Sequence, residues 1–327
     1  MTLVSIVTPS YNQAAFLEQT IQSVLQQDGV HLEYCVVDGA STDESPAIIR
    51  RYAHRLAWWV SEPDRGQAEA INTGFRRATG EVIAWLNSDD IYLPGAIQRA
   101  VAVLDANPAL GMVYGDALSI DETGRPVNKL AFRNWNLVDL LSFRIICQPA
   151  VFMRRAVLEQ AGYLDLDYHF MLDHHLWIRM ARLAPIQHIP HVLAAARQHA
   201  GAKNVKQAAG FSRETQRSLE WMQTQPDLAP LFRQHKRAIR GGAYRLEARY
   251  YLDGDQPGEA LRYYSRALLN SPFYALKHWH RITYALLAQV GLKKSADRLL
   301  RPASARQKLL SLPPEIQTIQ DWPGLKL

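Results

Sequence analysis

Residues 3–12, "LVSIVTPSYN", and residues 16–27, "FLEQTIQSVLQQ", decide the fold class. The first is an apolar run broken by Pro9, which predicts a buried strand, and the second has apolar residues at helical spacing. Residues 32–45, "LEYCVVDGASTDES", repeat the pattern, with Asp38 at the end of the second strand. Strands that alternate with helices over short links predict an α/β domain with a mostly parallel central sheet.

Polar residues gather at the ends of the predicted strands. Further strands are expected at 57–62, 81–87 and 111–117, with helices at 68–78 and after Pro94. In such sheets ligands bind beyond the carboxyl ends of the strands. The residues at those ends are Pro9, Asp38, Glu62, Asp64, Asp89 and Asp90. We therefore expect an acidic site along this edge of the sheet.

The stretch "WLNSDDIYLPG" at residues 85–95 places Asp89 and Asp90 directly after a buried strand. Two adjacent carboxylates are costly to bury unless a cation or hydrogen bonds compensate them, although "SDD" alone is also a common turn. Hard divalent cations prefer carboxylate oxygens and accept phosphate oxygens as further ligands. The chain has neither a G-x-G-x-x-G after its first strand nor a phosphate loop. These features favour a nucleotide whose diphosphate is held through a metal ion.

Four segments in order resemble glycosyltransferase family 2, the inverting enzymes of the GT-A fold: "VSIVTPSYNQAAFLEQTIQSVLQQ", "VVDGASTDES", "SEPDRGQAEAINTGFRRATGEVIAWLNSDD" and "DHHLWIRMA". The resemblance covers residues 1–204. It implies an enzyme that moves a sugar from a nucleoside-diphosphate sugar, with UDP as the default nucleotide. The implied acceptor is a hydroxyl of a saccharide or a lipid-linked molecule in cell-surface polysaccharide biosynthesis. The implied cofactor is a divalent metal ion, Mn²⁺ or Mg²⁺.

The resemblance also implies roles for single residues in the first half of the chain. The nucleotide would contact the first two strand ends and the "PDRG" loop, through Thr8, Pro9, Tyr11, Asp38, Asp64 and Arg65. "NSD" at 87–89 stands where the family carries its D-x-D motif, which makes Asp89 the metal ligand. Asn87, Ser88 and Asp90 would contact the nucleotide sugar. Asn87 departs from the family pattern, in which Asp is commoner.

"MLDHHLW" at 171–177 resembles the segment that carries the family's general base, which points to Asp173. Leu172 is a departure at a position that is often Glu. "RQHAGAK" at 197–203 resembles the segment that approaches the metal and the diphosphate. It makes His199 a candidate metal ligand, with Arg197 or Lys203 neutralising phosphate. One base that deprotonates the acceptor hydroxyl is sufficient for inversion, because the metal stabilises the leaving group.

Several alternatives stay open. Asp38 could cap a helix, Asp64 could belong to an ordinary turn, and Asp173 could pair with Arg179 or another basic residue. A sugar-phosphate nucleotidyltransferase is disfavoured, because the loop "TPSYNQAAF" lacks the glycines and basic residues that hold a triphosphate. A catalytically inert GT-A-like protein, acting as a nucleotide-sugar-binding or assembly module, is the second function class. Only Asn87 and Leu172 hint at it.

The remainder of the chain predicts helices. Residues 243–273 resemble one tetratricopeptide-type hairpin. Residues 201–327 carry 21 Lys+Arg against 10 Asp+Glu, which suits either an anionic membrane surface or a solvated basic face. Nothing points to nucleic acid. We expect a nucleotide-binding half at 1–117, an acceptor-binding half at 118–204 and a basic helical region at 205–327.

The expected location is the cytoplasm, with peripheral attachment at the inner face of the membrane as an option. The start of the chain lacks a signal-peptide pattern, and no apolar run approaches the about 20 residues of a membrane helix. The two cysteines, Cys35 and Cys147, show no pairing motif and fit a reducing compartment.

Overall fold

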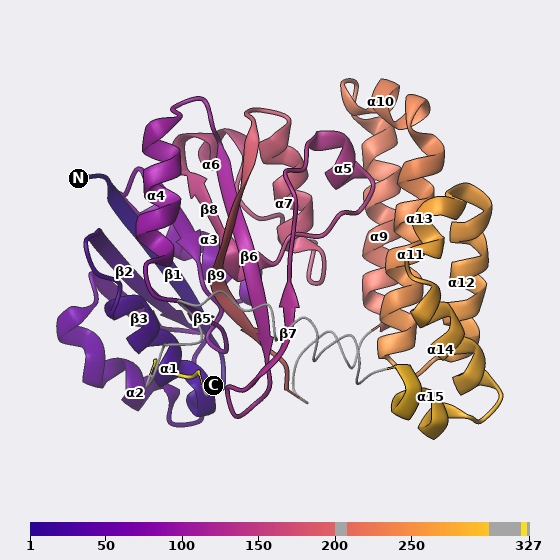
Figure 1. Cartoon of the computed structure of the whole chain (residues 1–327). Helices are drawn as coiled ribbons and strands as arrows, with labels where there is room; N and C mark the ends of the chain where they lie inside the picture. Colours follow the sequence, from indigo (N-terminus) through magenta and orange to yellow (C-terminus); the bar gives the residue numbers. More distant parts are fainter. Residues whose placement is uncertain (200–207, 301–321, 326–327) are drawn as a thin grey trace. The chain divides into compact units, whose positions relative to one another are not determined.

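A computed structural model describes residues 1–199, 208–300 and 322–325. The chain divides into two compact units (Figure 1). The first, which we call the sheet unit, contains residues 1–134, 146–198 and 312–327. The second, the helical unit, contains residues 135–145 and 199–311. Each unit is therefore built from segments that are discontinuous in the sequence. The functional halves at 1–117 and 118–204 stay a prediction.

The sheet unit is built on a nine-stranded sheet with the order β3-β2-β1-β4-β8-β6-β9-β5, and β7 pairs with β6. The strands are β1 (Leu3–Ser10), β2 (His31–Asp38), β3 (Trp58–Ser61), β4 (Val82–Trp85), β5 (Ile91–Tyr92), β6 (Met112–Ile120), β7 (Pro126–Leu130), β8 (Val151–Arg154) and β9 (Ile186–Arg197). The two longest ladders are parallel, with eight residue pairs between β1 and β2 and nine between β6 and β9. Antiparallel ladders join two to four pairs each. The predicted α/β fold with a mostly parallel sheet is confirmed.

Helices cover both faces of this sheet. They are α1 (Ala14–Leu25), α2 (Ser45–Tyr52), α3 (Gln67–Arg77), α4 (Ala96–Ala106), α6 (Arg155–Ala161) and α7 (Leu172–Ala181), with 3-10 turns η1 (Ala53–Arg55) and η2 (Gln148–Ala150). One core cluster joins α1, α2 and α4 to alternate residues of β1, β2 and β4. Successive strand side chains point to opposite faces, so Trp85 lies on the other face, against Phe75 of α3 and Trp177 of α7.

The helical unit contains α5 (Leu137–Leu141), α9 (Ala208–Thr224), α10 (Leu228–Gln234), α11 (Lys236–Asp253), α12 (Pro257–Asn270), α13 (Pro272–Leu276), α14 (Trp279–Gln289) and α15 (Lys293–Leu300). Small and aromatic residues of α11, α12 and α14 form its core, among them Ala248, Ala260 and Tyr264. The predicted helical character of this region is confirmed. Among the described residues, no helix has the length and apolar character needed to cross a membrane.

The segment 135–145, before β8, belongs to the helical unit. It packs closely against α11, which has a glycine at the point of contact. A Cβ on Gly242 would overlap the backbone of Ser142. The buried guanidinium of Arg245 donates to the carbonyl of Phe143 over 2.8 Å. These two contacts hold the segment 135–145 against α11, although about 100 residues separate them in the sequence.

Candidate active site

Asp38 lies at the edge of the sheet, where several hydrogen bonds hold its carboxylate. The parallel register aligns it with Ser10 of β1 and Ser61 of β3. Its fully buried carboxylate accepts hydrogen bonds from the Ser41 backbone N–H at 2.9 Å, from the Ser41 hydroxyl at 2.5 Å and from the Ser61 hydroxyl at 2.6 Å. The carboxylate therefore orders the loop after β2. It does not cap α2, since that helix begins four residues after Ser41.

The predicted nucleotide-lining residues at the end of β1 differ in their exposure to solvent; they are Thr8, Pro9 and Tyr11. Thr8 is fully buried, and its hydroxyl lies 2.9 Å from the hydroxyl of Tyr34 in the interior. Pro9 is buried as well. Tyr11 is 63% exposed, so its ring is the side chain of the three that a ligand can reach from solvent.

Asp64 lies against the loop that follows Asp38. A Cβ at Gly39 would lie 2.7 Å from Asp64 Oδ2, so only glycine allows this approach. The other oxygen of Asp64 accepts from the Gly66 N–H over 2.7 Å. Burial, followed by the nearby charges of Glu69 and Asp38, raises the pKa of Asp64. The structure thus brings Asp38 and Asp64 together, as the strand-end argument predicts.

Arg65 has a different surrounding. Its side chain is 74% exposed and pairs with Glu69, with 2.7 Å between Nη2 and Oε1. Both residues border a hollow of about 220 Å³ between the start of α3 and the loop before α7. The other lining residues are Gly66, Ala68, Leu166, Asp167 and His169. The predicted contact of Arg65 with phosphate stays a prediction.

Asn87 is the centre of an amide network behind the "NSDD" turn. Its Oδ1 accepts from Gln67 Nε2 at 2.8 Å, and its Nδ2 donates to Gln148 Oε1 at 3.0 Å and to Asp90 Oδ2 at 3.3 Å. Gln148 cannot turn its own amide over, because Gln148 Nε2 donates to the Trp85 carbonyl at 2.8 Å. Position 87 therefore needs a donor, which an aspartate carboxylate lacks. The departure from the family pattern has a structural reason.

Asp90 points into the protein. It is 5% exposed, its Oδ1 accepts from the Arg197 N–H at 3.0 Å, and its carbonyl accepts from the Thr20 hydroxyl at 2.7 Å. Burial, followed by the charge of Asp89, raises the pKa of Asp90 well above its ordinary range. Ser88 is buried, whereas Asp89 is only partly buried. Of the two adjacent acids, Asp89 is the one placed to meet a ligand. Contacts of Asn87, Ser88 and Asp90 with a nucleotide sugar stay predictions.

Arg197, at the end of β9, holds the "NSDD" turn in place. Its guanidinium is fully used by protein oxygens: Nε donates to the Asp89 carbonyl at 2.9 Å, while Nη1 and Nη2 donate to Asp121 O, Glu122 O, Gln19 Oε1 and Gly324 O. It also lies over the Phe16 ring, with 4.9 Å to the centroid. The expectation that Arg197 neutralises a phosphate is therefore wrong. The side chain is 5% exposed and has no N–H group left to offer.

The C-terminal segment 322–325 completes this arrangement within the sheet unit. Trp322 Nε1 donates to the Tyr92 carbonyl over 2.7 Å, and Leu325 packs in an apolar cluster with Ile91 of β5. Sequence reasoning missed this segment, and it missed Gln67 and Gln148. No local pattern marks a contact between residues that lie 20 to 230 positions apart.

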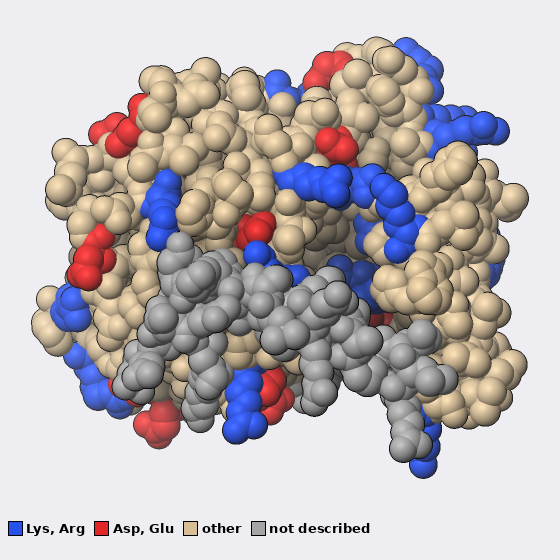
Figure 2. All heavy atoms as spheres, viewed as in Figure 1, with Lys and Arg blue, Asp and Glu red and all other residues tan. Residues whose placement is uncertain are grey.

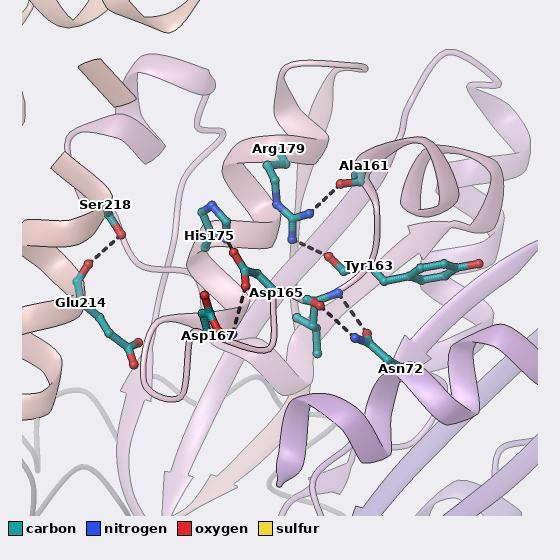
Figure 3. Close-up of polar contacts among 10 residues, drawn as sticks. Asn72, Ala161, Tyr163, Asp165, Asp167, His175, Arg179, Glu214 and Ser218 are labelled. Atoms are coloured by element: carbon teal, nitrogen blue, oxygen red, sulfur yellow. Dashed lines mark hydrogen bonds and ion pairs between the residues drawn. The ribbon is translucent and has the colours of Figure 1, made fainter. Parts of the chain in front are cut away.

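The loop that precedes Asp173 is tied down by side chains of α3 and α7 (Figure 3). Asn72 exchanges two hydrogen bonds with the backbone of Leu164, at 2.8 and 3.0 Å. Arg179 donates to the carbonyl of Ala161 at 2.6 Å and to that of Tyr163. The loop therefore presents a fixed backbone beside the hollow at Arg65.

Asp173 lies in the first turn of α7 and is partly buried, and its Oδ1 accepts from the His174 N–H at 2.7 Å. The alternative pairing with Arg179 is wrong, because that guanidinium is bonded to the two carbonyls of the loop. Trp177 is fully buried and stacks on Trp85, with 5.2 Å between the ring centroids, as expected of a core residue.

The second predicted metal ligand, His199, begins the helical unit. Its role stays a prediction. Lys203 lies outside the described residues. In the part of the chain that the structure describes, no three His, Cys, Asp or Glu side chains are grouped to hold a metal ion.

Comparisons with known proteins identify the family and the fold. The model of the family Glycosyl transferase family 2 matches residues 5–162. An uncharacterized glycosyltransferase of Nostoc sp. is 30% identical over 224 residues, which are 64% of this chain and 69% of that protein. A PGL/p-HBAD biosynthesis glycosyltransferase of Mycobacterium bovis is 31% identical over 196 residues, 58% of this chain and 75% of that protein. The chain spans 36% of another relative, an uncharacterized glycosyltransferase of Rickettsia conorii, at 30% identity over 62% of this chain.

Solved structures share the fold. The Staphylococcus aureus TarS fragment 1–349 has a TM-score of 0.60 at 18% identity, covering 94% of this chain and 92% of that one. Mannosyltransferase PcManGT from Pyrobaculum calidifontis has a TM-score of 0.60 at 22% identity, covering 88% and 86%. The chain belongs to glycosyltransferase family 2 and has the GT-A fold. It is a transferase enzyme, which confirms the resemblance seen in the sequence.

Proposed function

We propose that this protein is a metal-dependent, inverting glycosyltransferase that uses a nucleoside-diphosphate sugar, with UDP as the default nucleotide. Its acceptor would be a hydroxyl of a saccharide or lipid-linked molecule in cell-surface polysaccharide biosynthesis. The observation that carries the proposal is the set of acids Asp38, Asp64 and Asp89, which follow β2, β3 and β4 in the parallel part of the sheet, β3-β2-β1-β4. Two structural neighbours support it, since PcManGT is described in complex with GDP-Man and Mn²⁺ and TarS 1–349 in complex with UDP-GlcNAc.

In the proposed complex the nucleoside lies over the ends of β1 and β2, beside Tyr11, Asp38 and Asp64. Asp38 would affect binding mainly through the loop that it orders, because both its oxygens already accept hydrogen bonds within the protein. Arg65 is exposed on the same side and forms a surface ion pair with a partly exposed glutamate, so exchange of that partner for phosphate costs little.

The residues present fit a divalent ion that is bound mainly through the donor. Mg²⁺ and Mn²⁺ sites in nucleotide enzymes use one or two carboxylates, and phosphates and water complete the shell. Asp89 supplies one such carboxylate, and His199 and Lys203 are the proposed partners toward the ion and the diphosphate. When bound, the ion would neutralise charge on the departing nucleoside diphosphate.

Asp173 is the proposed general base. It would take the proton of the acceptor hydroxyl while that oxygen forms a bond to the anomeric carbon and the bond to the diphosphate breaks. A single displacement of this kind inverts the anomeric centre and needs one carboxylate, unlike the two that retaining hydrolases use. The pinned loop before α7 would keep the base at a constant distance from the hollow at Arg65.

A donor screen that scores released nucleoside diphosphate tests the proposal. Asp173→Asn should lower turnover by about 10²–10⁴-fold, the contribution of a general base, and keep nucleotide binding. Asp89→Ala should remove the part of nucleotide-induced thermal stabilisation that depends on Mn²⁺. Asp105→Asn, an exposed change that leaves one oxygen to accept from the Thr2 hydroxyl, is the matched control. No release with any donor, together with no thermal shift by any nucleoside diphosphate, would overturn the proposal.

A further inference from the structure

Helix α14 carries large exposed apolar side chains next to the residues that it buries. Ala285 is fully buried, and Ile282 packs with it against α11 and α12. Beside these residues Trp279 is 60% exposed, Leu286 52% and Val290, at the helix end, 67%. Steps of seven and four residues place these three side chains along one stripe. A helix on the surface of a protein normally presents polar residues there, so this stripe needs an explanation.

The stripe belongs to a larger feature, which we call the apolar face 269–292. Leu269 and Phe273, just before α14, are 82% and 86% exposed, and Leu276 and Leu292 are half exposed. Of the eleven large exposed apolar side chains in the described chain, seven lie within these 24 residues. The other four are scattered: Met1, Tyr11, Val127 and Leu183. Exposed apolar side chains gathered in this way mark an interaction surface, whereas scattered ones need no explanation.

The stretch of sequence that carries this face contains basic residues and no acids, although acids adjoin it. Residues 260–296 contain six Lys and Arg residues and no Asp or Glu. Three of the six pair with acids outside the stretch: Arg262 with Glu259, Arg281 with Asp253 and Lys293 with Asp255. Lys277 and Lys294 are exposed and make no hydrogen bond or ion pair with other described residues. Arg233, Lys236 and Arg237 of the same unit line a shallow hollow between α10 and α11. Figure 2 shows Lys and Arg side chains in the region of α10.

We propose that the apolar face 269–292 docks on a bilayer that contains anionic phospholipid. Phe273 and Trp279 would enter the interfacial layer, where aromatic side chains are favoured, and the lysines would contact the headgroups. Attachment of this kind lies in the plane of the interface. The cores of protein interfaces are depleted in lysine, so a second copy of the chain fits this mixture less well. The proposal extends the proposed function only in placing the enzyme beside lipid-linked acceptors.

Co-sedimentation of the full chain with vesicles tests the docking without donor or acceptor. We expect binding to phosphatidylglycerol–phosphatidylcholine vesicles, at least tenfold weaker binding to pure phosphatidylcholine, and weakening by salt. Phe273→Ser with Trp279→Ser should reduce vesicle binding at least tenfold. Both side chains are exposed, so the fold should persist, which circular dichroism checks. Val127→Ser with Leu183→Ser removes two exposed apolar side chains elsewhere and should leave binding unchanged.

A second double variant, Lys277→Glu with Lys294→Glu, tests the role of charge. It should abolish the preference for anionic vesicles and leave the exposed apolar side chains unchanged. Absence of wild-type binding to anionic vesicles at low salt would overturn the proposal, as would unchanged binding by the Phe273/Trp279 variant. A concentration-dependent dimer that the same variant abolishes would assign the face to a second copy. A negative donor screen would not affect any of these results, so the two proposals fail separately.

Discussion

Asn87→Asp should damage the protein, although it restores the residue that is commoner in the family. The amide nitrogen of Asn87 donates to Gln148 Oε1 and to Asp90 Oδ2 at 3.0 and 3.3 Å. A carboxylate in its place has no donor for either oxygen. It would also face the buried Asp90, whose pKa is already raised by burial.

The magnitude follows from two routes to the folded variant. Two unit charges about 4 Å apart repel by about 4 kcal/mol at an effective dielectric constant near 20. The pair can avoid this repulsion by binding one proton. Binding it costs about 1.4 kcal/mol for each pH unit by which the pH exceeds the ordinary carboxyl pKa. The lost hydrogen bond to Gln148 adds about 1 kcal/mol. The cheaper of the two routes costs about 4 kcal/mol at pH 7.5, so with the lost hydrogen bond we expect Asn87→Asp to lower the free energy of unfolding by about 5 kcal/mol.

The pH dependence gives the sharper result. A folded variant that holds an extra proton is stabilised as the pH falls, so the loss should shrink by up to about 1.4 kcal/mol per pH unit toward pH 5.5. Urea unfolding at several pH values measures this. Asn87→Ala, which removes the donor without adding charge, should show a smaller loss that does not change with pH. Adding Asp90→Asn to Asn87→Asp should recover part of the stability, because the new amide can donate to the introduced carboxylate in place of repelling it. A variant as stable as the parent at pH 7.5 would refute the reasoning.

Three further outcomes are expected. Arg197→Lys replaces a guanidinium with five N–H donors by an ammonium with three. The free energy of unfolding, measured with urea, should fall by about 2–4 kcal/mol. An unchanged midpoint of urea unfolding would contradict the role of Arg197 in holding the turn. Burial raises the pKa of Glu247 to about 7, so stability should fall between pH 4.5 and 7 and level off above. Glu247→Gln should remove up to about 3 kcal/mol of that loss of stability. If the stability of the variant and of the parent depends on pH in the same way, the pKa of Glu247 is not raised. Trp322→Phe keeps an aromatic side chain, although a smaller one, but loses the hydrogen bond to the Tyr92 carbonyl, and a thermal melt should show at least about 1 kcal/mol of destabilisation.

Local patterns were sufficient for the elements that form the edge of the site. A strand and the residue that follows it are set by periodicity over about ten residues, so Asp38, Asp64 and Asp89 could be placed at strand ends. The relation between neighbouring strands follows from the rule that parallel strands end at one edge. These inferences need no knowledge of distant contacts.

The remaining parts of the site depend on distant contacts. Gln148 reaches Asn87 across 61 positions, and Arg197 reaches Gln19 across 178. Neither residue type nor spacing marks such pairs, because an amide or a guanidinium bonds equally well to solvent in the unfolded chain. The antiparallel strand β8 was missed for a related reason. Its pairing with the distant strands β4 and β6 defines it.

The bond between Arg197 and the Gly324 carbonyl has a consequence for how the protein is made. The two residues are 127 positions apart, and synthesis at about 5–20 residues per second separates their appearance by roughly 6–25 s. During that interval the strands that carry the acids exist, but one acceptor of the buried guanidinium has not yet been made. The larger segment of the helical unit, residues 199–311, is translated in between. The turn that bears Asp89 therefore gains its full set of supporting hydrogen bonds only after the helical unit has been synthesised. A nascent chain that has all its strands still lacks part of the support for its candidate active site.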